Sequence, residues 1–82
     1  MAKPAQIKSG ADLPLGAFKW SWRAERAFQY SRMGGYWRGT SLEVFAHEQS
    51  HDCFRFTPMA GPATIAEIEA TMRAHGVWWR EP

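Results

Sequence analysis

The five residues His47-Glu48-Gln49-Ser50-His51 are the part of the chain whose types and spacing best fit a chemical reaction. On one helix, His47 and His51 would share a face one turn apart, where both imidazoles can bind the same Zn²⁺. Glu48 could then act as general base toward a water that the metal activates. The motif therefore raises the hypothesis of a zinc-dependent hydrolase, with His47 and His51 as ligands and Glu48 as the catalytic residue.

Over residues 44–53 the chain resembles the zincin metallopeptidases, which carry H-E-x-x-H on a helix. The resemblance implies a third ligand, and in one group of zincins this ligand is a glutamate further along the chain. Glu69 follows His51 by eighteen residues, a similar spacing, and takes this role if the resemblance holds. The alternative is a solvated helix face with two surface histidines, and on that interpretation the protein uses no cofactor.

Charge is distributed unevenly along the chain, although the net charge is only +2. Residues 1–39 hold seven Lys or Arg against two acidic residues, a net charge of +5, whereas residues 40–82 have a net charge of −3. Two explanations stay open. Either the two halves attract each other within the fold, or the basic half forms a binding face.

A binding function is suggested by surplus aromatic side chains near these cations. Five Trp, five Phe and two Tyr exceed what the core of an 82-residue chain needs. Rings among cations suit single-stranded nucleic acid, and Trp, Tyr and Arg also dominate protein interfaces. The residues predicted to contact a protein or nucleic-acid partner are Arg23, Arg26, Arg32, Trp37, Arg38, Trp78 and Trp79. For Trp78 and Trp79, packing in the core is the alternative.

Hydrophobic periodicity predicts the elements that would position these residues. Residues 17–23 and 53–57 alternate apolar with polar side chains, which is typical of strands. Residues 24–33 fit a helix and a strand about equally, and Gly34-Gly35 after them favours a hairpin turn.

Two helices are predicted from capping residues. Thr40 with Glu43 forms a capping box that predicts a short helix near residues 41–51. The best-specified element is a closing amphipathic helix over residues 65–75. Thr64 is the predicted N-cap and forms a second capping box with Glu67. Gly76 follows the helix and suits a Schellman stop in which Val77 returns to the last turn.

Together these patterns predict an α+β fold, a small antiparallel sheet of about three to four strands packed against the C-terminal helix. Residues 1–16 are predicted to be a flexible arm and residues 17–82 a single compact domain. A single cysteine, Cys53, excludes an internal disulfide and favours the cytoplasm, and no apolar run is long enough to cross a membrane. The function predicted from the sequence is a non-catalytic binding module, with the zinc hydrolase as alternative.

Overall fold

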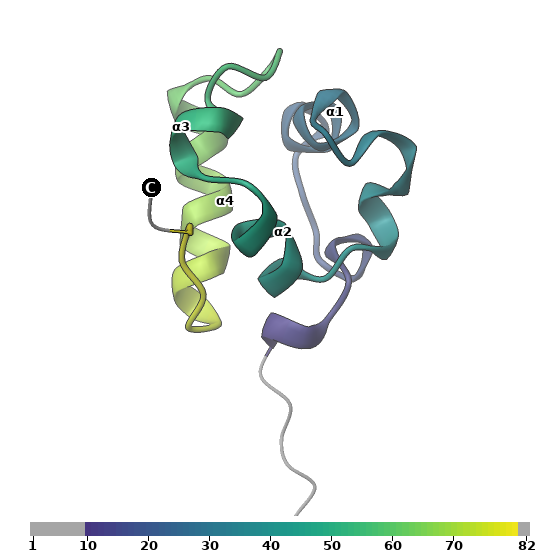
Figure 1. The fold of residues 1–82 in the computed structure, drawn as a ribbon, viewed down its shortest axis with the longest axis vertical. Helices are drawn as coiled ribbons and strands as arrows, with labels where there is room; N and C mark the ends of the chain where they lie inside the picture. The colour runs from purple at the N-terminus through teal and green to yellow at the C-terminus, as the bar shows by residue number, and fades with distance from the viewer. Residues whose placement is uncertain (1–9, 81–82) are drawn as a thin grey trace, which may run out of the picture.

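The computed structural model describes residues 10–80, and within them the chain is built of helices without a sheet (Figure 1). The only β feature in this part of the chain is an isolated antiparallel bridge between Pro14 and Ser41. The predicted α+β fold with three to four strands is therefore wrong, and the protein is a small helical domain. The elements are η1 (Gly10–Asp12), η2 (Leu15–Ala17), α1 (Trp22–Tyr30), η3 (Gly34–Gly39), α2 (Leu42–Glu48), α3 (His51–Phe54) and α4 (Pro62–Ala74).

Helix α1 begins at Trp22 and so replaces the last two residues of the predicted first strand. The Ser21 hydroxyl accepts a hydrogen bond from the backbone N–H of Ala24 at 3.2 Å, which caps the helix. Ala24, Ala27 and Phe28 follow at helical spacing and all three are buried. The alternation up to Trp22 therefore reflects a short extended lead-in, and the helical period that starts at Ala24 determines the structure.

The predicted hairpin at Gly34-Gly35 is a 3-10 helix instead. A two-residue type I′ turn needs positive φ at both central residues. Only Gly34 has it, at +55°, and the chain continues from there as η3. Trp37 on η3 turns inward and is buried, which anchors this segment against α1.

The predicted helix near residues 41–51 exists but is interrupted. Ser41, one residue after the predicted cap, accepts from Val44 N–H and starts α2. Gln49 then takes an extended conformation, with φ −128° and ψ 134°, so α2 ends at Glu48. Ser50 caps the separate helix α3 by accepting from Cys53 N–H. This second cap also explains why residues 53–57 do not form the predicted strand.

Helix α4 confirms the predicted closing helix, with a corrected start. Gly61 is the N-cap and Pro62 occupies the first turn, so the predicted cap Thr64 lies inside the helix and is buried. The C-terminal stop is as predicted. Gly76 has φ +71°, and the N–H of Val77 donates to the carbonyl of Met72 at 2.9 Å, the bond that defines a Schellman motif.

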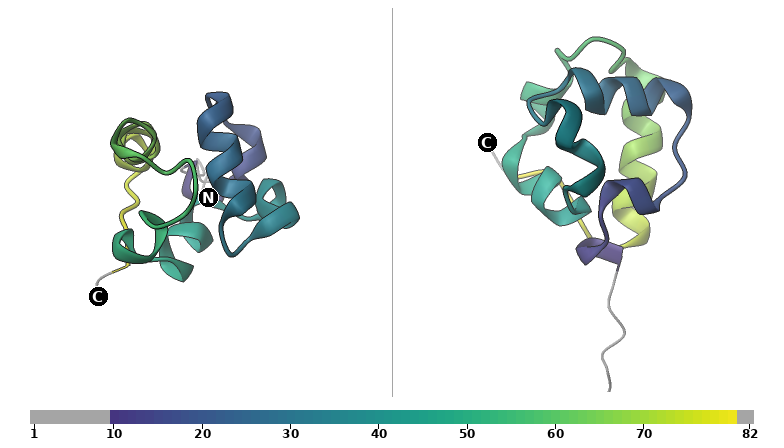
Figure 2. Two further views of the ribbon diagram at one scale, coloured as in Figure 1. Left: turned by 90° about the horizontal axis from the view of Figure 1, so that it is seen from above. Right: turned by 90° about the vertical axis from the view of Figure 1, so that its right-hand side faces the viewer.

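The core is a continuous aromatic cluster centred on Phe28. Its ring lies 5.0 Å from Trp37 and 5.2 Å from Phe45, centroid to centroid, and Phe45 in turn lies 5.2 Å from Phe54. The cluster joins α1, η3, α2 and α3, while Ile68 and Met72 of α4 are also fully buried. Figure 2 shows α1 crossing near the N-terminal end of α4, so the two longest helices enclose this core. The chain is short, and large aromatic side chains fill its interior without a sheet.

The first described residues belong to the folded body. Leu15 is fully buried and donates its N–H to the carbonyl of Thr40 at 2.8 Å, and Leu42 N–H donates to the carbonyl of Leu13. Residues 10–16, which are predicted to be part of a flexible arm, thus contact the core, and residues 1–9 lie outside the described residues. None of the helices within residues 10–80 has the length and apolar character needed to cross a membrane.

Candidate functional site

The H-E-x-x-H residues do not share a helix. His47 lies in the last turn of α2, and His51 is the first residue of α3. The extended backbone at Gln49 separates them. The one-turn spacing that would bring both imidazoles to one metal requires a continuous helix, and that condition is not met.

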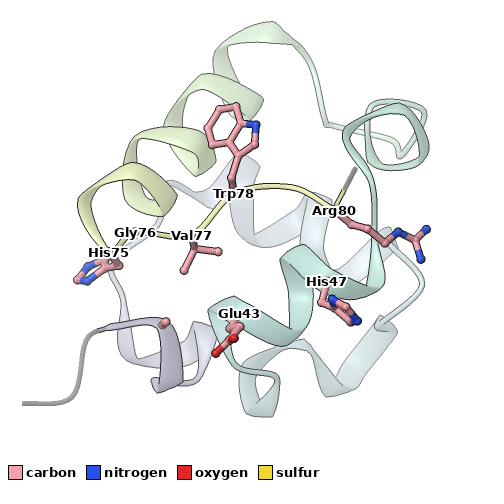
Figure 3. Close-up of a pocket in the computed structure, with 8 residues that line it drawn as sticks. Glu43, His47, His75, Gly76, Val77, Trp78 and Arg80 are labelled. Atoms are coloured by element: carbon pink, nitrogen blue, oxygen red, sulfur yellow. The ribbon is translucent and has the colours of Figure 1, made fainter. Parts of the chain in front are cut away.

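The predicted zinc residues also line three different pockets. His47 lines a pocket of about 410 Å³ with Glu43 and Arg80 (Figure 3), whereas Glu48 lines one of about 280 Å³. His51 and Glu69 line a third, of about 510 Å³. Within residues 10–80, no group of three or more His, Cys, Asp or Glu side chains is arranged to hold a metal ion.

Glu69, the predicted third ligand, has a hydrogen-bond partner in the part of the chain that the structure describes. Its carboxylate accepts a hydrogen bond from the indole Nε1 of Trp79 at 2.7 Å. The Trp79 ring then packs against Phe45, Phe54 and the imidazole of His51, the last at 5.8 Å. Glu69 therefore orients a core tryptophan, and His51 is an edge of the aromatic cluster.

The pocket in Figure 3 holds titratable side chains, but they do not converge. Glu43 and His47 extend from α2, and His75 lies at the far side of the pocket beside the end of α4. The His75 ring packs at 5.2 Å against Phe18, which gives it a role in packing. Trp78 points away from Glu43 and His47. The arrangement offers polar contacts without a nucleophile and base in hydrogen-bond reach of each other.

The predicted partner-binding residues divide into buried and exposed sets. Trp37 and Trp79 are 1% and 5% exposed, so both belong to the core. Trp78 is exposed, and the guanidinium of Arg73 lies 4.8 Å from its ring centre. The guanidinium carbon of Arg38 lies over the Trp37 ring, 4.5 Å from its centre. Arg32 lies in the turn after α1.

Arg23 and Arg26 share one face of α1 with two exposed rings, and we call Trp22, Arg23, Arg26 and Tyr30 the α1 face. Trp22 is 59% exposed, and the guanidinium carbons of both arginines lie within 5.8 Å of its ring centre. Tyr30, one turn beyond Arg26, is half exposed, and its hydroxyl is 3.5 Å from that guanidinium. This is the densest grouping of exposed rings and cations among the described residues.

The cations of the α1 face are not neutralised within the fold. Across residues 10–80, the ion pairs join Asp52 to His51 and to Arg55, all within α3 and the turn after it. No ion pair in that range links the basic half to the acidic half. One of the two explanations for the uneven charge was attraction between the halves. No ion pair among the described residues supports that explanation.

Sequence reasoning misses two features of this surface. The alternation of residues 17–23 places Trp22 on the inner side of a strand, although the helical spacing of Ala24, Ala27 and Phe28 could have placed it outside. Phe56, in the second predicted strand, is 75% exposed with Arg55 over its ring at 4.8 Å. The sequence does not indicate that Phe56 is exposed. Phe56 lies two positions after the buried Phe54, a spacing that would place both on the same face of a strand.

Comparison of the chain with models of protein families, with curated proteins and with solved structures finds no significant match.

Proposed function

We propose that the protein is a non-catalytic binding module that docks its α1 face onto an acidic surface of a protein partner. The single observation that carries the proposal is Trp22, an exposed tryptophan flanked by two arginines that have no ion pair within the described residues. Burying such a ring in a partner removes a large apolar area from water. The flanking guanidinium groups then select a partner surface that carries carboxylates.

The residue types and their spacing fit a protein interface. Trp22, Arg26 and Tyr30 follow each other at intervals of four, so they form a row over two turns of α1. Tryptophan, tyrosine and arginine are the residues that most often carry the binding energy of protein interfaces. A helix that presents a row at this spacing suits a groove on a larger protein.

The number of cations favours a protein over nucleic acid. Binding driven by phosphates commonly uses about six to ten contacts. The α1 face supplies two arginines, and Glu25 lies on the same helix. Two cations are sufficient to select an acidic pocket, but they are few for a groove that follows a phosphate backbone.

The α1 face is held in place before any partner arrives. Ala24, Ala27 and Phe28 bury the opposite side of the helix in the core. The N-terminus of α1 is hydrogen-bonded to Glu67 of α4 through Ser21. A preorganised helix loses little conformational entropy on binding, which favours a useful affinity from a small surface.

Photo-crosslinking tests this proposal. A benzophenone amino acid replaces Gln29, which is exposed on α1, and in a matched control it replaces Phe56. We expect a protein crosslinked through position 29 and not through position 56, and the purified partner should present an acidic patch at the crosslinked site. An adduct with nucleic acid, or α1-dependent binding of a labelled single-stranded oligonucleotide, would reassign the function.

The exposed, unpaired thiol of Cys53 supports a further part of the proposal, that the protein meets its partner in the reducing cytoplasm.

A further inference from the structure

A pocket of about 510 Å³ lies between α4 and the segment formed by α3 and the turn after it (Figure 1). Sites for small organic molecules occupy roughly 300–1,000 Å³, and most of their lining is apolar with a few polar groups. This pocket has such a lining: Phe56, Ala60, Pro62, Ile65 and Ala66 are apolar, and His51, Arg55 and Glu69 are polar. The four lining residues from α4 follow each other at helical spacing, so one face of α4 forms a whole side of the pocket.

Phe56 gives the pocket an apolar wall that the fold leaves uncovered. Its ring is 75% exposed, although the backbone around it is fixed: Thr57 N–H donates to the carbonyl of Phe54 at 2.8 Å, and Ala60 N–H donates to Thr57 at 3.0 Å. Met59 in the same turn has a φ of +73°, a left-handed conformation that is unfavourable for any residue with a side chain. The turn thus holds a large ring in water by a strained backbone, and strain of this kind gathers at ligand sites.

Glu69 brings to the pocket a negative charge that has no ion pair within residues 10–80. Its Oε2 accepts from the indole N–H of Trp79 at 2.7 Å, whereas Oε1 makes no hydrogen bond in the described structure. Arg73, one turn later on α4, lies over the ring of Trp78 instead of pairing with Glu69. The carboxylate is half-buried, so a cation that binds it replaces water it has already lost.

The cationic side chain in the lining already has partners. Nε of Arg55 lies 3.8 Å from the carboxylate of Asp52, which also lies 3.9 Å from Nδ1 of His51. The guanidinium of Arg55 also lies over the ring of Phe56, 4.8 Å from its centre. The charge in this pocket that is left for a ligand to neutralise is therefore the negative charge of Glu69.

We propose that this pocket binds a small organic amine with an aromatic or branched apolar body. The ligand ammonium donates to Glu69, and the apolar body covers Phe56 and Ile65. Trp79 positions the carboxylate for this role, because its indole N–H holds Glu69 while its ring packs at 5.8 Å against His51 on the α3 side of the pocket. The site shares no residue with the α1 face, so amine binding is independent of the proposed docking.

Nuclear magnetic resonance of the ¹⁵N-labelled full chain tests the site through its tryptophan indole signals. The chain has five tryptophans, and the indole N–H of Trp79 is the one bonded to Glu69. We expect 2-(1-naphthyl)ethylamine, added up to millimolar concentration, to shift this signal saturably. The indole signals of Trp20, which is bonded to Leu15, and of Trp22 on the α1 face should stay unchanged.

Two analogues of similar shape separate charge from apolar contact. The uncharged 2-(1-naphthyl)ethanol and the anionic 1-naphthylacetate should each bind at least about tenfold more weakly than the amine. The proposal is overturned if the amine does not shift the Trp79 signal, or if 1-naphthylacetate binds at least as tightly as the amine. The latter result would assign the pocket to anions that pair with Arg55.

Variants distinguish recognition by Glu69 from a structural role. Glu69→Gln keeps an acceptor for Trp79 but removes the charge, so it should weaken amine binding at least about tenfold and leave the affinity for 2-(1-naphthyl)ethanol unchanged. Phe56→Ala should weaken both ligands alike at unchanged melting temperature, because the ring is exposed. Equal weakening of both ligands by Glu69→Gln, or unchanged binding of the amine to that variant, would also overturn the proposal.

Discussion

Glu67 on α4 completes the N-terminal cap of α1, because its carboxylate accepts two hydrogen bonds from Ser21. One comes from the Ser21 backbone N–H at 2.8 Å and one from the hydroxyl at 2.7 Å. In a capping box the acidic residue stands three positions after the cap, but in α1 that position is Ala24. A residue 46 positions away performs the same function, and it ties the two longest helices together.

Ser21→Ala and Glu67→Ala should each lower the free energy of unfolding by about 1 kcal/mol, the usual cost of losing a helix cap. For a domain of this size that corresponds to a fall in melting temperature of about 4–8 °C. Chemical denaturation of both variants and the double variant measures the coupling. The double variant should lose less than the sum of the two, and strict additivity would show that the contact contributes nothing.

The contact between Ser21 and Glu67 shows how far the sequence could predict the fold. The sequence predicts Glu67 as the partner of Thr64 in a local capping box. In the structure α4 starts three residues earlier, with Gly61 as the N-cap, so Thr64 is not at the cap position. The Schellman stop at Gly76 is predicted correctly, because a glycine with positive φ depends on local geometry alone. The sheet is predicted wrongly, because the alternation of Phe18, Trp20 and Trp22 does not come from a strand. The indole N–H of Trp20 donates to the carbonyl of Leu15, and Trp22 faces solvent. Both placements depend on tertiary packing, which the local pattern does not contain.

The site is predictable in its residue types and not in its geometry. Arg23 and Arg26 are predicted to contact a partner, and the structure places them beside Trp22 on the α1 face. Trp37 and Trp79 are predicted in the same role and are buried. The zinc motif depends on helix continuity through Gln49, and that continuity is decided by the cap that Ser50 gives to α3. The hydrogen bond from the Cys53 N–H to the Ser50 hydroxyl starts a new helix at His51, although the local pattern favours one continuous helix.

Phe28→Ala should destabilise the protein by about 3–5 kcal/mol, because Phe28 contacts the rings of Trp20, Trp37 and Phe45 at the centre of the core. That loss is comparable to the whole stability of a domain of this length. Circular dichroism during thermal unfolding measures it, with Phe56→Ala as the exposed aromatic control. A loss of equal size in both variants would place the core elsewhere.

Gly76→Ala should lower stability by about 1–2 kcal/mol, because alanine is strained at a φ of +71°. Gly35→Ala is the matched control, since a Cβ added at Gly35 would have no atom within 4 Å and the φ there is not in the left-handed region. Denaturant titrations of the two variants provide the comparison. Equal stability of both would mean that α4 does not need its Schellman stop.

Addition of equimolar Zn²⁺ should leave the melting temperature of the untagged protein unchanged, because His47 and His51 lie on separate helices. A ligand bound to the folded state at a hundred times its Kd would raise stability by about 2.7 kcal/mol, which calorimetry resolves easily. The His47→Ala variant serves as control. If zinc stabilises the unmodified protein but not this variant, the zinc-site hypothesis would be supported.

Docking through the α1 face is tested most directly by titration calorimetry with the partner recovered by crosslinking. Trp22→Ala removes the exposed ring between Arg23 and Arg26, whereas Phe56→Ala removes an exposed ring with a stacked arginine elsewhere. We expect Trp22→Ala to weaken Kd at least about thirtyfold, as for an interface anchor of about 2 kcal/mol. The Phe56→Ala variant should bind as the unmodified protein does. Equal affinity of the Trp22→Ala variant and the unmodified protein would contradict docking through the α1 face.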